Sequence, residues 1–255
     1  MKTKTKIALI TGGSRGLGKN MALQLAKKGL DVIITYNSNK TEADKVVAEI
    51  EELGNKAYAL QLDVSEYNHY EPFFKEHLEQ ALQSKFENTK IDYLINNAGF
   101  GIYKPFAETT IDEFKDMVHI HLMAPFFITQ NALNYMNDGG GIVNISSGLA
   151  RFSNPGYAAY ATMKGAVETL SKYQALELGA RKIRVNVVAP GAIETDFGGG
   201  VVRDNKDLNT MLANQTALGR VGLPDDIGSV VAFLCTDDAK WVNAQRIEVS
   251  GGIHI

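Results

Sequence analysis

Three side chains are spaced so that together they could move a proton to or from an oxygen atom. Tyr160 and Lys164 are four residues apart, which places them on one face of a helix, and Ser147 comes thirteen residues before Tyr160. A tyrosine hydroxyl has an ordinary pKa of about 10, but a nearby ammonium favours the phenolate and lowers that pKa. The trio therefore suits acid–base chemistry at a carbonyl or alcohol oxygen. A redox reaction at the same carbon would also need a hydride carrier.

The tyrosine–lysine spacing alone does not identify a site, because it occurs twice in the chain. Tyr36 and Lys40 are also four residues apart, in a polar sequence that follows an apolar run, and we interpret this copy as a coincidence. The copy at Tyr160 is flanked by alanines and followed by an apolar pattern of helical period. The alternative interpretation is that Tyr160 is a half-buried core aromatic residue and that Lys164 lies on a solvated helix face. The spacing by itself favours this alternative.

A glycine-rich segment near the N-terminus has the features of a seat for the hydride carrier. An apolar run ends at Thr11, and Gly-Gly-Ser-Arg-Gly-Leu-Gly and then a helical pattern follow it. Glycine at positions 12, 16 and 18 permits a tight turn, close approach to a pyrophosphate and close packing of helix on strand. The start of the helix offers free N–H groups to phosphates. This strand–turn–helix context predicts a dinucleotide site, with the spacing G-x-x-x-G-x-G.

The end of the second apolar run distinguishes between the two nicotinamide cofactors. An NAD site usually has an acidic residue there, which binds the adenine ribose hydroxyls. This chain has Thr-Tyr-Asn-Ser at positions 35–38, without a carboxylate, while Arg15 in the glycine loop is placed to meet a 2′-phosphate. Asn37, Ser38 and Lys40 could add to that contact. We therefore predict NADP(H) rather than NAD(H), the alternative being that Arg15 lies free in solvent.

Short apolar runs alternate with segments of helical period along the chain. Most of the runs are rich in Val and Ile without polar alternation, as strands covered on both faces should be. This pattern predicts an α/β fold, a single domain over residues 1–255 with a doubly wound parallel seven-stranded sheet and helices on both faces. The predicted strands are Ile7–Thr11, Val32–Thr35, Ala57–Gln61, Tyr93–Asn96, Ile142–Ser146, Val185–Ala189 and Arg246–Val249. The predicted helices are Gly18–Lys28, Glu42–Leu53, Tyr70–Phe86, Ile111–Tyr135, Gly156–Leu178 and Asp225–Cys235.

Residues 195–223 do not fit this alternation. They contain three consecutive glycines, at positions 198–200, and predict a mobile loop beside the substrate. A short helix is expected within it, around Asp207–Gln215.

Composition and charge exclude several classes of partner. A net charge of −3 and a pI near 6.0 give no reason to expect nucleic acid. No stretch approaches the ~18 apolar residues of a membrane span, and the apolar run after the basic start Met1–Lys6 is too short for a signal peptide. The single cysteine, Cys235, excludes an internal disulfide and fits a reducing compartment. We predict a cytoplasmic protein without a metal site.

The glycine loop and the Ser147–Tyr160–Lys164 set together resemble the short-chain dehydrogenase/reductase family. Four further motifs match that family in order and at consistent spacing, so the resemblance extends from Ile7 to Gly252. These motifs are Asp63-Val64, Asn96-Asn97-Ala98-Gly99, Pro190-Gly191-Ala192-Ile193-Glu194-Thr195-Asp196 and Gly251-Gly252. The resemblance implies a Rossmann fold in which hydride moves between nicotinamide C4 and the carbon of a ketone or secondary alcohol.

The resemblance also implies the catalytic roles. Tyr160 would act as the general acid in reduction, and Ser147 would hydrogen-bond the same substrate oxygen. Lys164 would bind the nicotinamide ribose hydroxyls and lower the pKa of Tyr160. The residue at position 121 departs from the family, because His121 stands where many relatives have an asparagine that helps to hold a water in a proton relay. His121 could support that relay, add a group that titrates near neutral pH, or be a polar residue tolerated in the core.

The implied cofactor contacts are spread over the whole chain. Asp63 would contact the adenine, Asn97 would line the adenosine side, and Asn96 would tie strands together. Ile193 by its backbone and Thr195 by its side chain would orient the carboxamide. The full predicted set is Gly12, Ser14, Arg15, Gly16, Leu17, Gly18, Tyr36, Asn37, Ser38, Asp63, Val64, Asn97, Ala98, Gly99, Tyr160, Lys164, Pro190, Gly191, Ile193 and Thr195.

The substrate is less defined than the chemistry. The expected pocket is mostly apolar with two phenols, which suits a ketone with an aromatic or alkyl group; it comprises Phe100, Ile102, Tyr103, Leu149, Phe152, Tyr157, Phe197 and Met211. The pattern is most similar to 3-oxoacyl thioester reductases and broad-range ketoreductases, with glucose-dehydrogenase-like sugar dehydrogenases as an alternative. A dinucleotide-sensing protein without catalysis is disfavoured, because such proteins usually lose the tyrosine or the lysine. The resemblance further implies a homotetramer, formed through the helix of Tyr160 and the C-terminal region.

Overall fold

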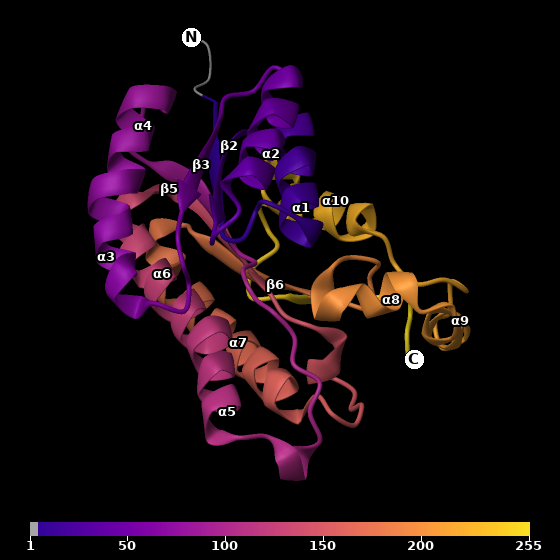
Figure 1. Ribbon diagram of the computed structural model, residues 1–255. Helices are drawn as coiled ribbons and strands as arrows, with labels where there is room; N and C mark the ends of the chain where they lie inside the picture. Colours follow the sequence, from indigo (N-terminus) through magenta and orange to yellow (C-terminus); the bar gives the residue numbers. More distant parts are fainter. Residues whose placement is uncertain (1–4) are drawn as a thin grey trace.

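Seven strands form one parallel sheet at the centre of the structure, a computed structural model that describes residues 5–255 (Figure 1). Residues 1–4, which belong to the predicted domain and to the basic start of the chain, lie outside the described residues. The spatial order β3-β2-β1-β4-β5-β6-β7 confirms the predicted doubly wound sheet. The strands are β1 Ile7–Ile10, β2 Asp31–Tyr36, β3 Ala57–Gln61, β4 Ile91–Asn96, β5 Met136–Ile145, β6 Arg184–Pro190 and β7 Arg246–Val249.

Helices cover both faces of the sheet, because alternate strand side chains point to opposite sides. In β1, Ala8 and Ile10 are buried against the layer of α1, α2 and α10, whereas Ile7 and Leu9 are buried against the layer that includes α4 and α6 (Figure 1). The helices are α1 Gly16–Lys27, α2 Lys40–Glu52, α3 Tyr70–Pro72, α4 Glu79–Phe86, α5 Ile111–Val118, α6 Ala124–Ala132, α7 Ala158–Glu177, α8 Val201–Asp204, α9 Lys206–Asn214 and α10 Pro224–Leu234. None of the helices within residues 5–255 has the length and apolar character needed to cross a membrane.

The helix predicted over Ile111–Tyr135 is divided by a widened turn. A π-helical turn, His119–Met123, separates α5 from α6, and Leu133–Tyr135 forms a 3₁₀ turn. Pro125 lies just after the π turn and has no N–H to give to the carbonyl of His121, four residues earlier. The second long predicted helix, Tyr70–Phe86, also contains a π turn, at Phe73–Leu78. Periodicity predicted both helical stretches but not these local changes of pitch.

The segment 195–223 is more regular than the sequence predicted. A 3₁₀ turn, Phe197–Gly200, leads into α8 and α9, and α9 agrees with the expected helix around Asp207–Gln215 to within one residue at each end. Gly198, Gly199 and Gly200 all have positive φ, from 61° to 79°. Glycine adopts this left-handed region without steric cost, which explains the three consecutive glycines. The predicted mobility of the segment stays a prediction.

Candidate active site

The loops at the carboxyl ends of neighbouring strands carry the predicted site. The glycine loop follows β1, Asn97 follows β4, Ser147 follows β5, and the segment 191–195 follows β6. In an open parallel sheet this edge is where ligands bind, at the point where the winding changes direction. That point lies between β1 and β4, which are adjacent in the sheet. Asp63 and Val64 after β3 reach the same edge.

The glycine loop is shaped by close approach and by two threonines. A Cβ on Gly18 would lie 2.1 Å from the Gly12 carbonyl oxygen and 2.6 Å from Nδ2 of Asn97, so only glycine fits there. Asn97 donates from Nδ2 to the carbonyls of Thr11 and Gly12, at 2.9 and 3.1 Å. This amide therefore holds the loop itself, and the expected place of Asn97 along the adenosine stays a prediction. The Thr35 hydroxyl accepts from the amide of Gly12 at 3.1 Å.

Sequence reasoning missed these two threonines. Thr11 Oγ1 accepts from the amides of Asn97 and Ala98, both at 3.0 Å, and thereby joins the loop after β4 to the glycine loop. The signal that could have revealed them is a hydroxyl residue near the end of each of two otherwise apolar strands. Thr11 and Thr35 are 3% and 1% exposed, and hydroxyls that are buried in this way need hydrogen-bond partners. By contrast, Asn96 donates to Asn144 at 2.8 Å and confirms its expected role between strands.

The amino end of α1 fits an anionic group. The helix begins at Gly16, has no side-chain cap and has no acidic residue in its first turn, so its first N–H groups are free to bind phosphate. Thr195 lies beside this helix start, since a Cβ on Gly16 would be 3.8 Å from the Thr195 Cβ. Six further residues of the predicted cofactor set lie at this edge of the sheet, in the glycine loop and the start of α1, after β4, and at or after the end of β6: Ser14, Leu17, Ala98, Pro190, Gly191 and Ile193.

The end of β2 has the composition expected of an NADP site. Tyr36 is buried, Asn37 and Ser38 are exposed, and no carboxylate occupies these positions. Arg15 is exposed and forms no ion pair with any residue in the described part of the chain. Lys40 pairs with Asp44 on its own helix at 2.7 Å, and its predicted contact with the 2′-phosphate stays a prediction.

The residues of the predicted trio lie together, and two of them are almost fully buried. Tyr160 and Lys164 are 7% and 5% exposed on the first turns of α7, and the Lys164 Nζ lies 5.4 Å from the centre of the Tyr160 ring. Lys164 Nζ donates to the carbonyl of Ile145 at 2.9 Å, which ties it to the end of β5. Ser147 follows that strand end, and its hydroxyl accepts from the Leu149 amide at 3.2 Å. The first tyrosine–lysine copy has no such setting.

Burial dominates the acid–base properties of the pair. It raises the pKa of Tyr160, and a hydrogen bond with Ser147 acts in the opposite direction. The expected lowering of the Tyr160 pKa by Lys164 is therefore not seen among the protein's own groups. Burial also lowers the pKa of Lys164 to about 8. Tyr160 is consequently protonated at neutral pH, as a proton donor must be.

His121 lies in the π turn, next to Tyr160. Its ring meets that of Tyr160 edge-on, with centroids 5.2 Å apart, and a Cβ on Gly99 would lie 2.5 Å from the imidazole. Nε2 is 2.7 Å from the Phe100 carbonyl and so carries the hydrogen, whereas the buried Nδ1 has no partner among residues 5–255. Burial, with the nearby Lys164 charge, lowers the pKa of His121 to about 3. The suggestion that His121 titrates near neutral pH is therefore wrong.

The buried neutral imidazole predicts a specific loss of stability in acid. The unfolded chain takes up a proton at His121 as pH falls through about 6.5, but the folded protein does not until about 3. We expect this residue to lower the free energy of unfolding by about 2 kcal/mol between pH 7 and pH 5. Urea denaturation at both pH values measures the change, which should largely disappear in His121→Asn. An equal pH dependence in the variant would contradict the buried neutral state.

Aromatic side chains surround the catalytic tyrosine. The Phe197 ring lies 5.8 Å from the Tyr160 ring and packs on Gly101, whose Cβ would approach it to 2.6 Å. The rings of Tyr103 and Tyr157 pack edge-on, with centroids 5.4 Å apart. The partly buried Ile102 and Leu149 pack against a buried hydrophobic cluster that contains Tyr160. The Phe152 ring packs against His254 of the C-terminal tail, with ring centroids 4.5 Å apart, and it also lies beside Gly148, whose Cβ would approach it to 2.8 Å. Its predicted place in the pocket stays a prediction.

Known proteins share both the sequence pattern and this architecture. A family model described as enoyl-(acyl carrier protein) reductase matches residues 12–254. The hydroxynaphthalene reductase-like protein Arp2 of Metarhizium brunneum is 37% identical over 258 residues, covering 97% of this chain and 94% of that protein. The chain belongs to the short-chain dehydrogenase/reductase family.

Two solved structures are similar over almost their whole length. LugOII, described as a promiscuous reductase that catalyses keto-reduction at C1 during lugdunomycin biosynthesis, has a TM-score of 0.92 at 37% identity, covering 98% of each chain. The angucycline C-6 ketoreductase LanV with bound NADP also has a TM-score of 0.92, at 36% identity, covering 98% of this chain and 96% of LanV. Both share the fold that positions the site.

Proposed function

We propose that the protein is an NADP(H)-dependent carbonyl reductase that transfers hydride between the nicotinamide and a ketone or secondary alcohol. The observation that carries this proposal is the buried Tyr160–Lys164 pair, placed with Ser147 at the same sheet edge as the uncapped start of α1. The NADP-bound LanV and the reductase LugOII support the cofactor and the reaction class.

In the proposed mechanism the protein positions one oxygen atom and supplies one proton. The cofactor, when bound, supplies the hydride. Tyr160 donates its hydroxyl proton to the substrate oxygen as negative charge develops there, and Ser147 donates a hydrogen bond to the same oxygen. Lys164 would hold the nicotinamide ribose and return a proton to Tyr160. Nδ1 of His121, which has no partner among residues 5–255, would accept a hydrogen bond from a water in this relay, so that His121 would support the relay without changing its own protonation.

Cofactor preference gives a direct test at Arg15. A charge-assisted contact to a 2′-phosphate is worth about 1.5–3 kcal/mol, so Arg15→Ala should lower kcat/KM for NADPH by about 10- to 100-fold. The same variant should change kcat/KM for NADH by less than about twofold, because NADH has no 2′-phosphate. Lys27→Ala, which removes an exposed cation at the other end of α1, is the matched control. Equal losses with both cofactors would contradict the assignment.

The aromatic surroundings of Tyr160 favour a ketone attached to a flat ring system. Phe197, Tyr103 and Tyr157 offer ring faces and edges for such a substrate. Arp2 and LanV, whose descriptions name hydroxynaphthalene and angucycline compounds, support the same class. A panel of aryl ketones, a β-keto thioester and glucose, assayed with NADPH and NADP⁺, separates this class from 3-oxoacyl thioester reductase and sugar dehydrogenase activity. Tight NADPH binding without turnover on any of them would instead indicate a dinucleotide sensor.

We further propose that the enzyme is a cytoplasmic homotetramer. Its helical layer exposes large apolar side chains on and next to α5, α6 and α7, a composition that suits contact between subunits. These side chains are Ile111, Phe114, Phe126, Phe127, Tyr173 and Leu176. The single buried cysteine, Cys235, fits a reducing compartment.

A further inference from the structure

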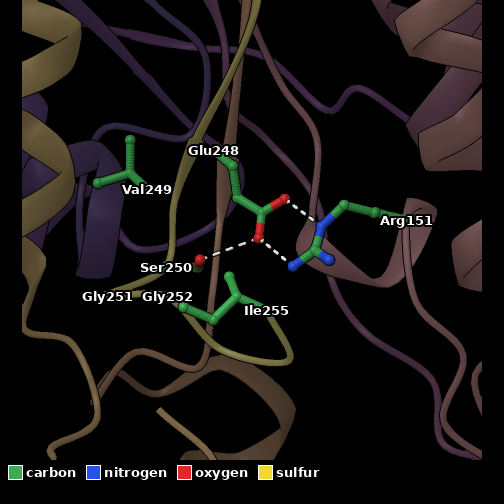
Figure 2. A pocket seen from close by; sticks show the side chains of 7 residues that line it. All are labelled: Arg151, Glu248, Val249, Ser250, Gly251, Gly252 and Ile255. Atoms are coloured by element: carbon green, nitrogen blue, oxygen red, sulfur yellow. Dashed lines mark hydrogen bonds and ion pairs between the residues drawn. The ribbon is translucent and has the colours of Figure 1, made fainter. Parts of the chain in front are cut away.

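Beside the strand end that leads to Ser147 lies a row of alternating charges that the proposed mechanism does not use. It consists of Arg151, Glu248, Arg246 and Glu168, and we call it the charge row. Arg246 lies between the two carboxylates, with Nε 2.6 Å from Glu168 and Nη1 2.8 Å from Glu248. Figure 2 shows the outer end, where Glu248 faces Arg151 and Ser250. The two cations balance the two anions, so the row leaves no net charge for a ligand.

The inner end of the charge row holds the backbone from which the catalytic serine projects. Ser146 is 2% exposed, and its hydroxyl donates to Glu168 Oε1 at 2.7 Å. Arg246 Nη2 donates to the main-chain carbonyl of Ser147 at 3.3 Å. Glu168 lies one helical turn after Lys164 on α7. The row therefore reaches the strand end that carries Ser147 and the helix that carries Lys164.

The outer end fixes the residues that follow Ser147. Arg151 lies directly after the short turn Gly148–Ala150, and both its Nε and its Nη2 contact Glu248 at 2.6 Å. The same guanidinium donates to the carbonyls of Ile253 and His254, at 2.8 and 3.1 Å. The chain on either side of the catalytic serine is thus tied to β7 and to the C-terminal tail.

We propose that Glu168 and Arg246 are positioning residues that fix the direction of the Ser147 hydroxyl. This inference rests on the proposed role of Ser147 in holding the substrate oxygen. A planar guanidinium donates hydrogen bonds in fixed directions. Arg246 therefore fixes the positions of the Glu168 carboxylate, the Glu248 carboxylate and the Ser147 carbonyl relative to one another. The backbone fixes the position of Cβ, and the hydroxyl can only choose among the staggered χ1 rotamers about it, so a shift of residues 146 and 147 moves the hydroxyl away from the substrate oxygen.

Kinetic constants of three variants test the positioning role. We expect Arg246→Ala and Glu168→Gln each to lower kcat about tenfold, because small misplacements at a reacting centre are costly. The KM for NADPH should change less than about twofold, since the charge row does not touch the glycine loop. Arg246→Lys should not restore kcat, because an ammonium lacks the fixed fork. Glu168→Gln keeps the size and an acceptor for Ser146, so it serves even if Arg246→Ala folds poorly.

Arg181, in the 3₁₀ turn Gly179–Arg181, provides a matched control because it ties down the start of the strand that leads to Ser147. It donates to Asp138 at 2.8 Å and to the carbonyls of Leu133 and Met136, at 2.9 and 2.7 Å, at the other end of β5. Arg181→Ala should lower the Tm as Arg246→Ala does, but leave kcat unchanged. If both variants lower kcat in proportion to their loss of stability, the charge row only supports the fold and the proposal is overturned.

A double-mutant cycle separates positioning from general support. In a Ser147→Ala background the hydroxyl to be positioned is gone, so Arg246→Ala should change kcat by less than about twofold, against about tenfold in the native background. An equal loss in both backgrounds overturns the positioning role while the proposed function stands. A wild-type protein that reduces no ketone with NADPH contradicts the proposed function, and the inference with it.

Discussion

Tyr160→Phe is expected to lower kcat for ketone reduction by about 10³-fold, within the range that general acids contribute. The change removes the hydroxyl and nothing else from a ring that is 7% exposed, so the packing around it should persist. Because burial raises the pKa of Tyr160, this side chain holds its proton at neutral pH and can donate it to the substrate oxygen. Phenylalanine has no proton to give.

The same variant should bind NADPH almost as well as the native enzyme. Fluorescence titration measures that binding, and steady-state assays measure the loss of kcat. Tyr93→Phe is the control, because Tyr93 is buried at 1% exposure in β4 and its hydroxyl contacts Lys6 at a distance from the site. A Tyr160→Phe enzyme with native turnover would show that the proton comes from another group.

Lys164→Met should lower kcat by about 100-fold and also raise the KM for NADPH, since the ammonium is assigned to both the ribose and the proton relay. Its effect on folding should be the reverse of its effect on activity. Burial lowers the pKa of Lys164 to about 8, which means that keeping this side chain charged inside the folded protein costs free energy of folding. We therefore expect a Tm equal to or above that of the native protein.

Lys172→Met on the same helix is the matched control, because Lys172 is exposed and should affect neither activity nor Tm. A loss of activity in Lys164→Met that is accompanied by a lower Tm would indicate a structural role for the lysine. Retention of full activity would contradict its assignment to the cofactor and to the relay.

Sequence reasoning predicted the doubly wound parallel sheet, and it singled out Ser147, Tyr160 and Lys164 as a candidate trio, because both predictions rest on patterns within short stretches of the chain. Runs of Val and Ile without alternation indicate buried parallel strands, and the strand–glycine–helix sequence at 7–18 has few other structural uses. The division of the helix after Ile111 was not predicted, since a π turn needs only one residue more per turn than the regular pattern. Pro125 was the one local signal of it.

The partners of polar side chains were the least predictable feature. The use of Asn97 to hold the glycine loop depends on the close approach of β1 and β4, two strands that are far apart in sequence. The charge row likewise joins residues 151, 168, 246 and 248, which only the folded chain brings together. A signal for the row does exist in the sequence. Arg246 and Glu248 are two residues apart in a strand, so both point to one face, where burial requires them to be paired.

Hydride transfer itself provides the most direct test of the central claim. The wild-type enzyme is incubated with an aryl ketone and NADPH that carries deuterium at nicotinamide C4, in one or the other stereochemical position. We predict that one of the two labelled cofactors delivers deuterium to the carbinol carbon of the alcohol, with one NADPH oxidised for each alcohol formed. Oxidation of NADPH without labelled alcohol, or binding without oxidation for every ketone tested, would contradict the assignment of this protein as a carbonyl reductase.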